Sequence, residues 1–298
     1  MATKKAASTK KATAKKPAAA KTTIRTVKAE PKPVVKAEAV SARSRATVLP
    51  NNIVNIVFAE LVGTFILTVV ALLSVKETGA LYVGLALTVL VMTIGVVSGS
   101  HVNPAVTFGL WAMRRLKTVL VPFYWGAQFL GAMLAVIVMN WLSNGSVKLN
   151  FDHIGSLDWG IFGIELIAAA VFMFGLAAAV SRRELSVTGK AFGVGLSLMV
   201  AIVVGTSLLA TVRNTYDTSK WTAVTDIQHA FRVSGPTVNP AIALASTEAT
   251  DASFTGTRAS KDEKQYSRLS LEVVLGTLIG AALGGNLYLL IAGARRND

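Results

Sequence analysis

The sequence predicts an all-α membrane protein with six transmembrane helices and two short re-entrant helices arranged as an inverted repeat. The chain is 52% hydrophobic and only 15% charged, with a mean hydropathy of +0.54, a composition that soluble globular domains rarely reach. Several apolar stretches are long enough to cross a hydrocarbon core of about 30 Å as helices. One motif, Asn-Pro-Ala, occurs twice, at corresponding places in the two halves of the chain.

The first fifty residues differ in composition from the rest. They hold thirteen Lys or Arg against two Glu, so +11 of the net charge of +14 lies there. Such a segment, rich in Lys, Ala, Thr and Pro, has too few large apolar side chains to fold. The apolar run that follows is too long for a secretory signal, so we expect the tail to stay on the protein. The sequence predicts a disordered basic tail at 1–50 and a membrane-embedded domain at 51–298.

The apolar stretches place the spans and the basic residues orient them. We expect spans at 53–73, 81–97, 119–142, 159–180, 191–211 and 269–292. Two shorter apolar pieces, at 104–111 and 240–245, cannot cross. Basic residues next to the spans fall on one side, namely the tail, Arg114, Arg115, Lys117, Arg182, Arg183, Lys190, Arg295 and Arg296. Because Lys and Arg are retained in the cytoplasm, both termini are predicted to be cytoplasmic, in a multi-pass protein of the cell membrane.

The two halves repeat, at about 53–142 and 159–292. Glu60 lies near the start of the first span of one half, and Glu165 lies near the start of the first span of the other. Asn103 and Asn239 each follow two spans later. Each half has three spans, an odd number, so the second half must be inverted relative to the first. The two motifs then enter from opposite faces of the membrane.

The motif residues predict two half-helices that meet at the membrane midplane. The motifs are Asn103, Pro104 and Ala105, and Asn239, Pro240 and Ala241. Asn is a good helix N-cap, and Pro is tolerated at the first helical position. With their starts facing each other, the two Asn amides would donate hydrogen bonds to an oxygen passing between them. The positive ends of both helix dipoles would oppose cations and protons, whereas a neutral solute meets no such barrier.

These motifs, together with the segments 59–64, 124–132 and 276–284, resemble the major intrinsic protein family, the aquaporins and glycerol facilitators, over 53–292. The resemblance implies an aquaporin-like fold and a passive channel for water or another small uncharged solute. It also implies a homotetramer with one pore in each subunit. We expect no catalytic residues, no cofactor and no metal, because the chain has no Cys, three His and no carboxylate cluster.

The family's second constriction uses four side chains, one of them an Arg directly after the second motif. Here that position is Ile242, and alignment with the family pattern places the other three at Leu85, Ile202 and Pro236. An apolar ring either widens the pore or gates it by dewetting. A broader facilitator for glycerol or ammonia is therefore an alternative function.

A longer loop precedes the second motif. Glu60 and Asn103 are 43 positions apart, whereas Glu165 and Asn239 are 74 apart. Arg213 or Arg232, which lie beside or within this loop, could therefore fold back as a substitute for the missing Arg.

Three polar residues have both a functional and a structural interpretation. An ionisable group inside a span, as at Glu60 and Glu165, is a functional candidate by default. The resemblance implies instead that both carboxylates support the re-entrant loops by accepting backbone N–H bonds. His101, two positions before Asn103, either packs behind its loop or lines the pore as a pH-sensitive group. We favour the supporting role for all three.

Two further interpretations concern the tail and the function class. A Lys- and Ala-rich tail resembles those that neutralise nucleic-acid phosphates. Beside a first span, however, it is expected to lie on anionic lipid headgroups rather than on nucleic acid. A non-conducting membrane scaffold or adhesion protein is an alternative suggested by the long segment 247–268, although two intact motifs argue against it.

Overall fold

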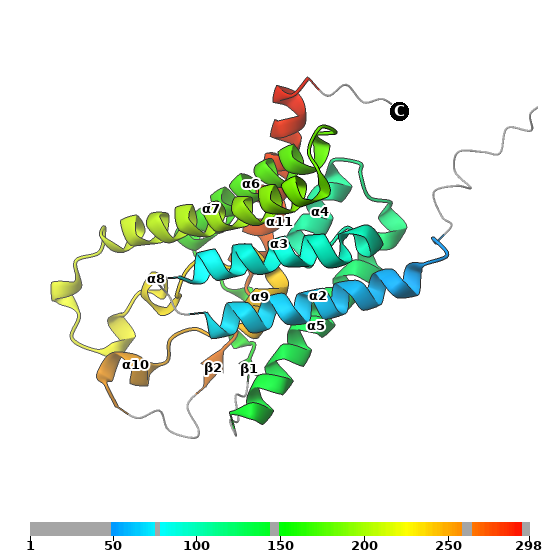
Figure 1. Ribbon diagram of the computed structural model, residues 1–298. Helices are drawn as coiled ribbons and strands as arrows, with labels where there is room; N and C mark the ends of the chain where they lie inside the picture. The colour runs from blue at the N-terminus through cyan, green and yellow to red at the C-terminus, as the bar shows by residue number, and fades with distance from the viewer. Residues whose placement is uncertain (1–48, 75–77, 144–148, 258–263, 294–298) are drawn as a thin grey trace, which may run out of the picture. The chain divides into compact units, whose positions relative to one another are not determined.

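The structure is a computed structural model that describes residues 49–74, 78–143, 149–257 and 264–293 (Figure 1). Nearly all of the predicted tail, residues 1–48, lies outside the described residues. The long helices are α2 (Ile53–Leu73), α3 (Gly79–Ser98), α5 (Val121–Leu142), α6 (Trp159–Ser181), α7 (Val187–Arg213) and α11 (Leu271–Ile291). Six helices in this part of the chain are long and apolar enough to cross a membrane, at positions that confirm the predicted spans.

Shorter elements connect and complete the long helices. The half-helices α4 (Pro104–Ala112) and α9 (Pro240–Ala245) begin where the motifs predict them. The other short helices are α8 (His229–Arg232), α10 (Asp251–Thr255) and the 3-10 turns η1 (Thr118–Leu120), η2 (Asp152–Gly155), η3 (Thr218–Lys220) and η4 (Val224–Asp226). One feature departs from the all-α prediction, because β1 (Leu149–Asn150) pairs in parallel with β2 (Gln265–Tyr266).

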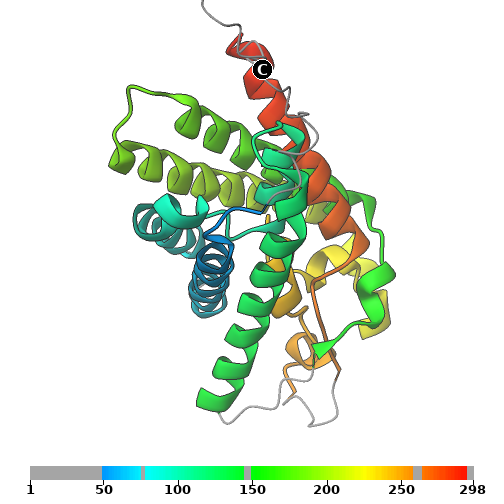
Figure 2. The same cartoon turned by 90° about the vertical axis from the view of Figure 1, so that its right-hand side faces the viewer.

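The two halves pack as equivalent units. Helix α2 lies against α3 and α5, just as α6 lies against α7 and α11. Helices α3 and α7 join the halves, and each half-helix also contacts the last long helix of the other half, α4 with α11 and α9 with α5 (Figure 2). A Cβ atom at Gly131 would collide with the carbonyl oxygen of Leu61, and one at Gly280 with that of Leu166. The small residues therefore permit close crossings within a single chain.

The interior is apolar and so is the outside of the helices. Leu67, Leu87, Met173 and Leu198 are buried together at the centre of the main core. Large apolar side chains also lie on the exterior, among them Phe58 at 67% exposure. A surface of that kind is unfavourable in water and is covered in a bilayer.

Candidate functional site

The two half-helices begin at capped asparagines. Asn103 Oδ1 accepts the Ala105 N–H at 2.8 Å, and Asn239 Oδ1 accepts the Ala241 N–H at 3.0 Å. Both asparagines have extended backbone, and a proline follows each of them at the first helical position. These are the features of a well-formed helix start, since the cap pairs one of the N–H groups that the first turn leaves free.

The same two asparagines join the half-helices to each other. Asn103 Nδ2 donates to the carbonyl oxygen of Val238 at 2.9 Å, and Asn239 Nδ2 donates to that of Val102, also at 2.9 Å. The arrangement is reciprocal, as an inverted repeat requires. A side-chain amide has two N–H groups, and these bonds use one of each pair. The second N–H of each asparagine has no partner among the described residues.

The residues just before each asparagine adopt a strained backbone. Val102 has φ of 44° and Val238 has φ of 55°. This left-handed region is unfavourable for β-branched side chains and persists only where the surroundings impose it. The strain places the carbonyl group of each valine where the asparagine of the other half reaches it.

In the first half, the buried carboxylate of Glu60 holds this turn. Its Oε1 accepts the His101 N–H at 2.9 Å and the Ser98 hydroxyl at 2.6 Å. Its Oε2 accepts the Val102 N–H at 2.7 Å and the Gln128 side-chain amide at 2.8 Å. All four partners are donors, so the carboxylate serves the loop and no contact is left for a solute.

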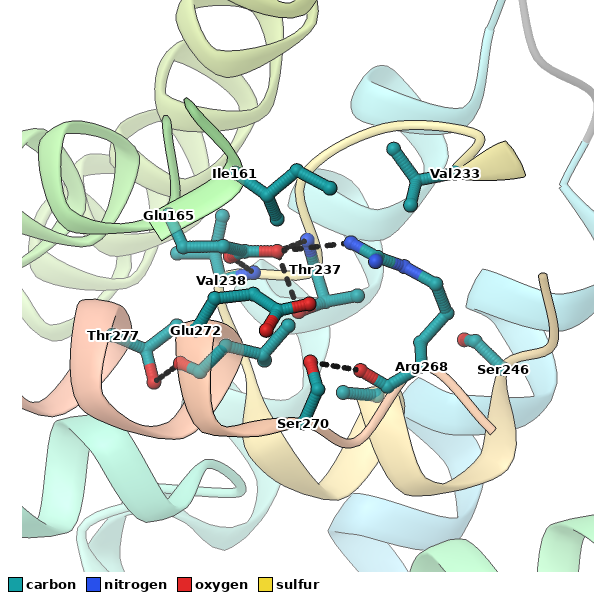
Figure 3. Close-up of polar contacts among 12 residues, drawn as sticks. Ile161, Glu165, Val233, Thr237, Val238, Ser246, Arg268, Ser270, Glu272 and Thr277 are labelled. Carbon is teal, nitrogen blue, oxygen red and sulfur yellow. Dashed lines mark hydrogen bonds and ion pairs between the residues drawn. The ribbon is translucent and has the colours of Figure 1, made fainter. Parts of the chain in front are cut away.

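In the second half, Glu165 makes the equivalent contacts. Its Oε1 accepts both the N–H of Thr237, at 2.8 Å, and the Thr237 hydroxyl, at 3.1 Å. Its Oε2 accepts the Val238 N–H at 2.9 Å. A guanidinium nitrogen of Arg268 lies 3.5 Å from Oε1 (Figure 3). Glu60 and Glu165 thus hold equivalent turns, as the supporting interpretation of both residues expects.

His101 packs behind its loop. Its side chain is buried and stacks on Tyr124, with ring centroids 4.4 Å apart. The ring Nδ1 lies 3.2 Å from the Thr107 hydroxyl oxygen, on the first half-helix. Of the two interpretations of this residue, its contacts favour loop packing.

A cavity of about 250 Å³ opens beside the second motif, and we call it the mouth cavity. Three of the four predicted constriction residues line it, Ile202, Pro236 and Ile242. Leu85 does not, and its place in this group was wrong: its side chain is 42% exposed on the outside of α3. Val83, two positions earlier and buried, lines the cavity instead.

The arginine beside this cavity is not one that the sequence suggested. Arg213 donates to the carbonyl oxygens of Ala230 and Val233, and Arg232 pairs with Asp251 at 2.8 Å. Neither lines the mouth cavity, so the prediction of a substitute Arg at these two positions was wrong. Arg268 does line it. The signal for it in the sequence is a basic residue just before the last span.

A cluster of polar side chains lies in the loops near this cavity. Glu248 is buried and accepts from the His229 ring at 2.9 Å, and the His153 ring lies 3.2 Å from its other oxygen. Burial opposes ionisation of Glu248, but the His229 hydrogen bond and the charges of His229, His153 and Arg268 lower its pKa overall. Within the described ranges, no group of His, Cys, Asp or Glu side chains is arranged to hold a metal ion.

Comparison with known proteins gives one family. The family model described as "Major intrinsic protein" matches residues 51–215. "Aquaporin NIP2-3" of Zea mays is 30% identical over 144 residues, which cover 45% of this chain and 48% of that protein. "Aquaporin Z" of Photorhabdus laumondii is 34% identical over 151 residues, 42% of this chain and 65% of the relative. The chain thus spans about half the length of the first of these curated relatives.

A solved structure was also found. The structure described as an aquaglyceroporin from Plasmodium falciparum has a TM-score of 0.48 and 19% identity, with 80% of this chain and 95% of that chain covered. The family match ends before the second Asn-Pro-Ala motif. The interpretation of that motif therefore rests on the geometry described above.

Proposed function

The chain belongs to the major intrinsic protein family, and from this premise we propose that it forms a passive transmembrane channel for water or small uncharged solutes. The pore centre lies at the two motifs, Asn103 to Ala105 and Asn239 to Ala241. One observation carries this proposal. Each asparagine donates one amide N–H to the other half of the chain and keeps its second N–H free of the described residues.

This pairing determines which solutes pass. Two N–H donors on adjacent helix starts hold an oxygen that accepts two hydrogen bonds, as water and hydroxylated solutes do. The half-helices α4 and α9 aim their positive ends at the same place, and each end is equivalent to at most about half an elementary charge. Cations and protons are repelled there, whereas a neutral solute exchanges one set of hydrogen bonds for another.

Stopped-flow light scattering of proteoliposomes tests the channel directly. The protein should raise osmotic water permeability well above that of protein-free vesicles, and Asn103→Ala and Asn239→Ala should each remove most of the increase. Asn286→Ala is the matched control, because Asn286 lies exposed on α11 and bonds only to its own helix. If the folded protein leaves vesicles as impermeable to water, glycerol and ammonia as empty ones, the channel is refuted and a scaffold role takes its place.

A broader facilitator for glycerol or ammonia is the second candidate. The large apolar side chains in the wall of the mouth cavity are Val83, Ile202, Pro236 and Ile242, and the same wall also contains Ser74, Thr206, Ser234, Thr237, Ser246 and Arg268. The apolar side chains accommodate the carbon backbone of a polyol better than a polar ring does. Glycerol uptake at a rate comparable with water flux would favour this candidate, and water flux alone would exclude it.

The remaining expectations concern the membrane context. We propose a homotetramer in the cell membrane with both termini in the cytoplasm, so that the mouth cavity faces outward. The basic residues beside α4 and between α6 and α7 support this orientation. Protease cleavage of the tail only in permeabilised cells would agree with it, and cleavage in intact cells would reverse it. The mass of the detergent-free particle gives the subunit number.

A further inference from the structure

The short loop between α4 and α5 carries three basic residues beside a cavity. Arg114, Arg115 and Lys117 all have exposed side chains. Together with Trp111 and Thr118 they line a cavity of about 990 Å³, which we call the loop cavity. The mouth cavity contains none of these residues, and neither does either Asn-Pro-Ala motif. The channel proposed above therefore leaves the loop cavity without a role.

The loop cavity lies at the level where helices enter the membrane. Leu116 and Val119 of the loop belong to the same apolar cluster as Leu49 and Ile53, at the start of α2 (Figure 1). The mouth cavity reaches Ser74, at the other end of α2. Because α2 has 21 residues, its two ends are about 30 Å apart, the thickness of a hydrocarbon core. The loop cavity is thus at the headgroups of the leaflet opposite the mouth cavity.

Hydrogen bonds fix the shape of this loop. The Arg114 N–H donates to the Trp111 carbonyl oxygen and the Arg115 N–H to that of Leu110, both at 2.8 Å. Arg114 has φ of 60°, a left-handed conformation that glycine adopts at helix ends without steric cost. The Trp111 indole N–H donates to the Thr118 hydroxyl oxygen at 2.9 Å and closes the loop. The guanidinium of Arg114 is therefore held at the cavity in spite of an unfavourable backbone.

The charges of Arg114 and Arg115 have no counter-ion among the described residues. The ion pairs of Arg and Lys side chains found there lie elsewhere, at Lys220, Arg232, Lys264 and Arg268. The sequence from 78 to 151 contains no Asp or Glu. The loop cavity thus presents two uncompensated guanidinium groups next to the membrane surface.

We propose that the loop cavity binds the phosphate group of an anionic membrane lipid, with the guanidinium groups of Arg114 and Arg115 as donors. A guanidinium can donate two parallel N–H bonds to phosphate oxygens, and basic pockets at the ends of spans are suited to lipid headgroups. Trp111 is 38% exposed and adds an aromatic ring of the kind that lies at headgroup level. A zwitterionic lipid is disfavoured, because it brings an ammonium group to the two cations. The proposal requires only that the chain lies in a membrane, so it is independent of the solute that the pore conducts.

Bromine quenching of Trp111 tests the site in the full-length protein. Lipids with brominated acyl chains quench a tryptophan that they contact, and the Trp111 signal is the difference between each protein and the same protein with Trp111→Phe. In phosphatidylcholine vesicles, a minor fraction of brominated phosphatidylglycerol should quench Trp111 more than the same fraction of brominated phosphatidylcholine. Each basic residue near an anionic surface is equivalent to about fivefold in binding, so Arg114→Gln with Arg115→Gln should reduce this preference about 25-fold. Every protein compared carries the basic tail, so its attraction for anionic lipid cancels.

The turn between α6 and α7 supplies the matched control. Arg182 and Arg183 are exposed there, on the same side of the predicted topology, but Glu184 follows them directly. Arg182→Gln with Arg183→Gln should therefore keep the parental preference. If the Arg114 and Arg115 double variant does not fold, Arg115→Gln alone avoids the left-handed position and should lower the preference about fivefold.

Three results would overturn the proposal. One is a parent protein that shows no preference for the anionic lipid. Another is a folded Arg114→Gln, Arg115→Gln or double variant that keeps the parental preference; water flux measured in the same vesicles then shows separately whether the channel is intact. The third is a loss of preference in excess inorganic phosphate beyond that in chloride of equal ionic strength, which would assign the site to a soluble phosphate.

Discussion

Glu60→Gln is the sharpest test of how the first re-entrant loop is held. The carboxylate is fully buried and accepts four hydrogen bonds, two on each oxygen. A glutamine of the same shape keeps one oxygen and can satisfy two of the donors. Its NH₂ group, however, would face two other donors, either the Val102 N–H and the Gln128 amide or the Ser98 hydroxyl and the His101 N–H.

The expected loss follows from these contacts. Two charge-assisted hydrogen bonds, at about 1.5–3 kcal/mol each, give a destabilisation of about 3–6 kcal/mol. A neutral amide is easier to bury than a carboxylate, which moves the expectation toward the lower end of that range. Because the Val102 N–H helps to fix the left-handed turn that presents its carbonyl to Asn239, water permeability should fall as well.

The free energy of unfolding is measured by titration with a denaturing detergent in mixed micelles, followed by tryptophan fluorescence. Glu184→Gln is the matched control, because Glu184 is exposed in the turn between α6 and α7. It should change stability by no more than about 0.5 kcal/mol. A Glu60→Gln protein that loses less than about 1 kcal/mol and conducts like the parent would refute this account of the loop.

Three further predictions follow from other parts of the molecule. The lowered pKa of Glu248 stabilises the fold above the ordinary carboxyl pKa, and this contribution is lost as the pH falls through the lowered value. In a scan from pH 7 to pH 3, the melting temperature of Glu248→Gln should therefore change less with pH than that of the parent. Equal changes of melting temperature with pH in the two proteins would contradict this. Gly280→Ala should lower the free energy of unfolding by about 1–3 kcal/mol, because the new Cβ would collide with the Leu166 carbonyl oxygen. Gly163→Ala, which has open space around it, should raise the free energy of unfolding by up to about 1 kcal/mol. Deletion of residues 2–45 should leave water flux unchanged and weaken sedimentation with anionic vesicles, since each basic residue adds about 1 kcal/mol there; lost flux would assign the tail another role.

The helices could be predicted because their causes are local. The thickness of the bilayer sets the length of a span at about twenty apolar residues. Helices α4 and α9 begin where an asparagine N-cap precedes a proline, at Asn103 with Pro104 and at Asn239 with Pro240. Inversion of the second half followed from the odd number of spans alone. None of these steps required knowledge of which side chains meet.

The mouth cavity could not be predicted in the same way. Leu85 and Val83 are two positions apart, and two positions turn a helix by about 200°, so a small alignment error moved the assignment to the opposite face of α3. Arg268 lies 103 positions from Glu165 in the chain. Their approach depends on β1 and β2, and strands of two residues leave no periodic pattern in a sequence.

In the described part of the chain, the two halves of the inverted repeat give their supporting glutamates different side-chain partners. Gly131 packs against Leu61, the residue after Glu60, and Gly280 packs against Leu166, the residue after Glu165, so the two glycines are equivalent positions of the repeat. Gln128 and Thr277 each lie three residues before these glycines and therefore also correspond. In the first half the neutral amide of Gln128 donates to Glu60 at 2.8 Å. In the second half the Thr277 hydroxyl turns back to its own helix and donates to the Val273 carbonyl at 2.7 Å. Arg268 then becomes the side-chain partner of Glu165 from outside the loop, so the side chain that pairs with the supporting glutamate is neutral in the first half and cationic in the second.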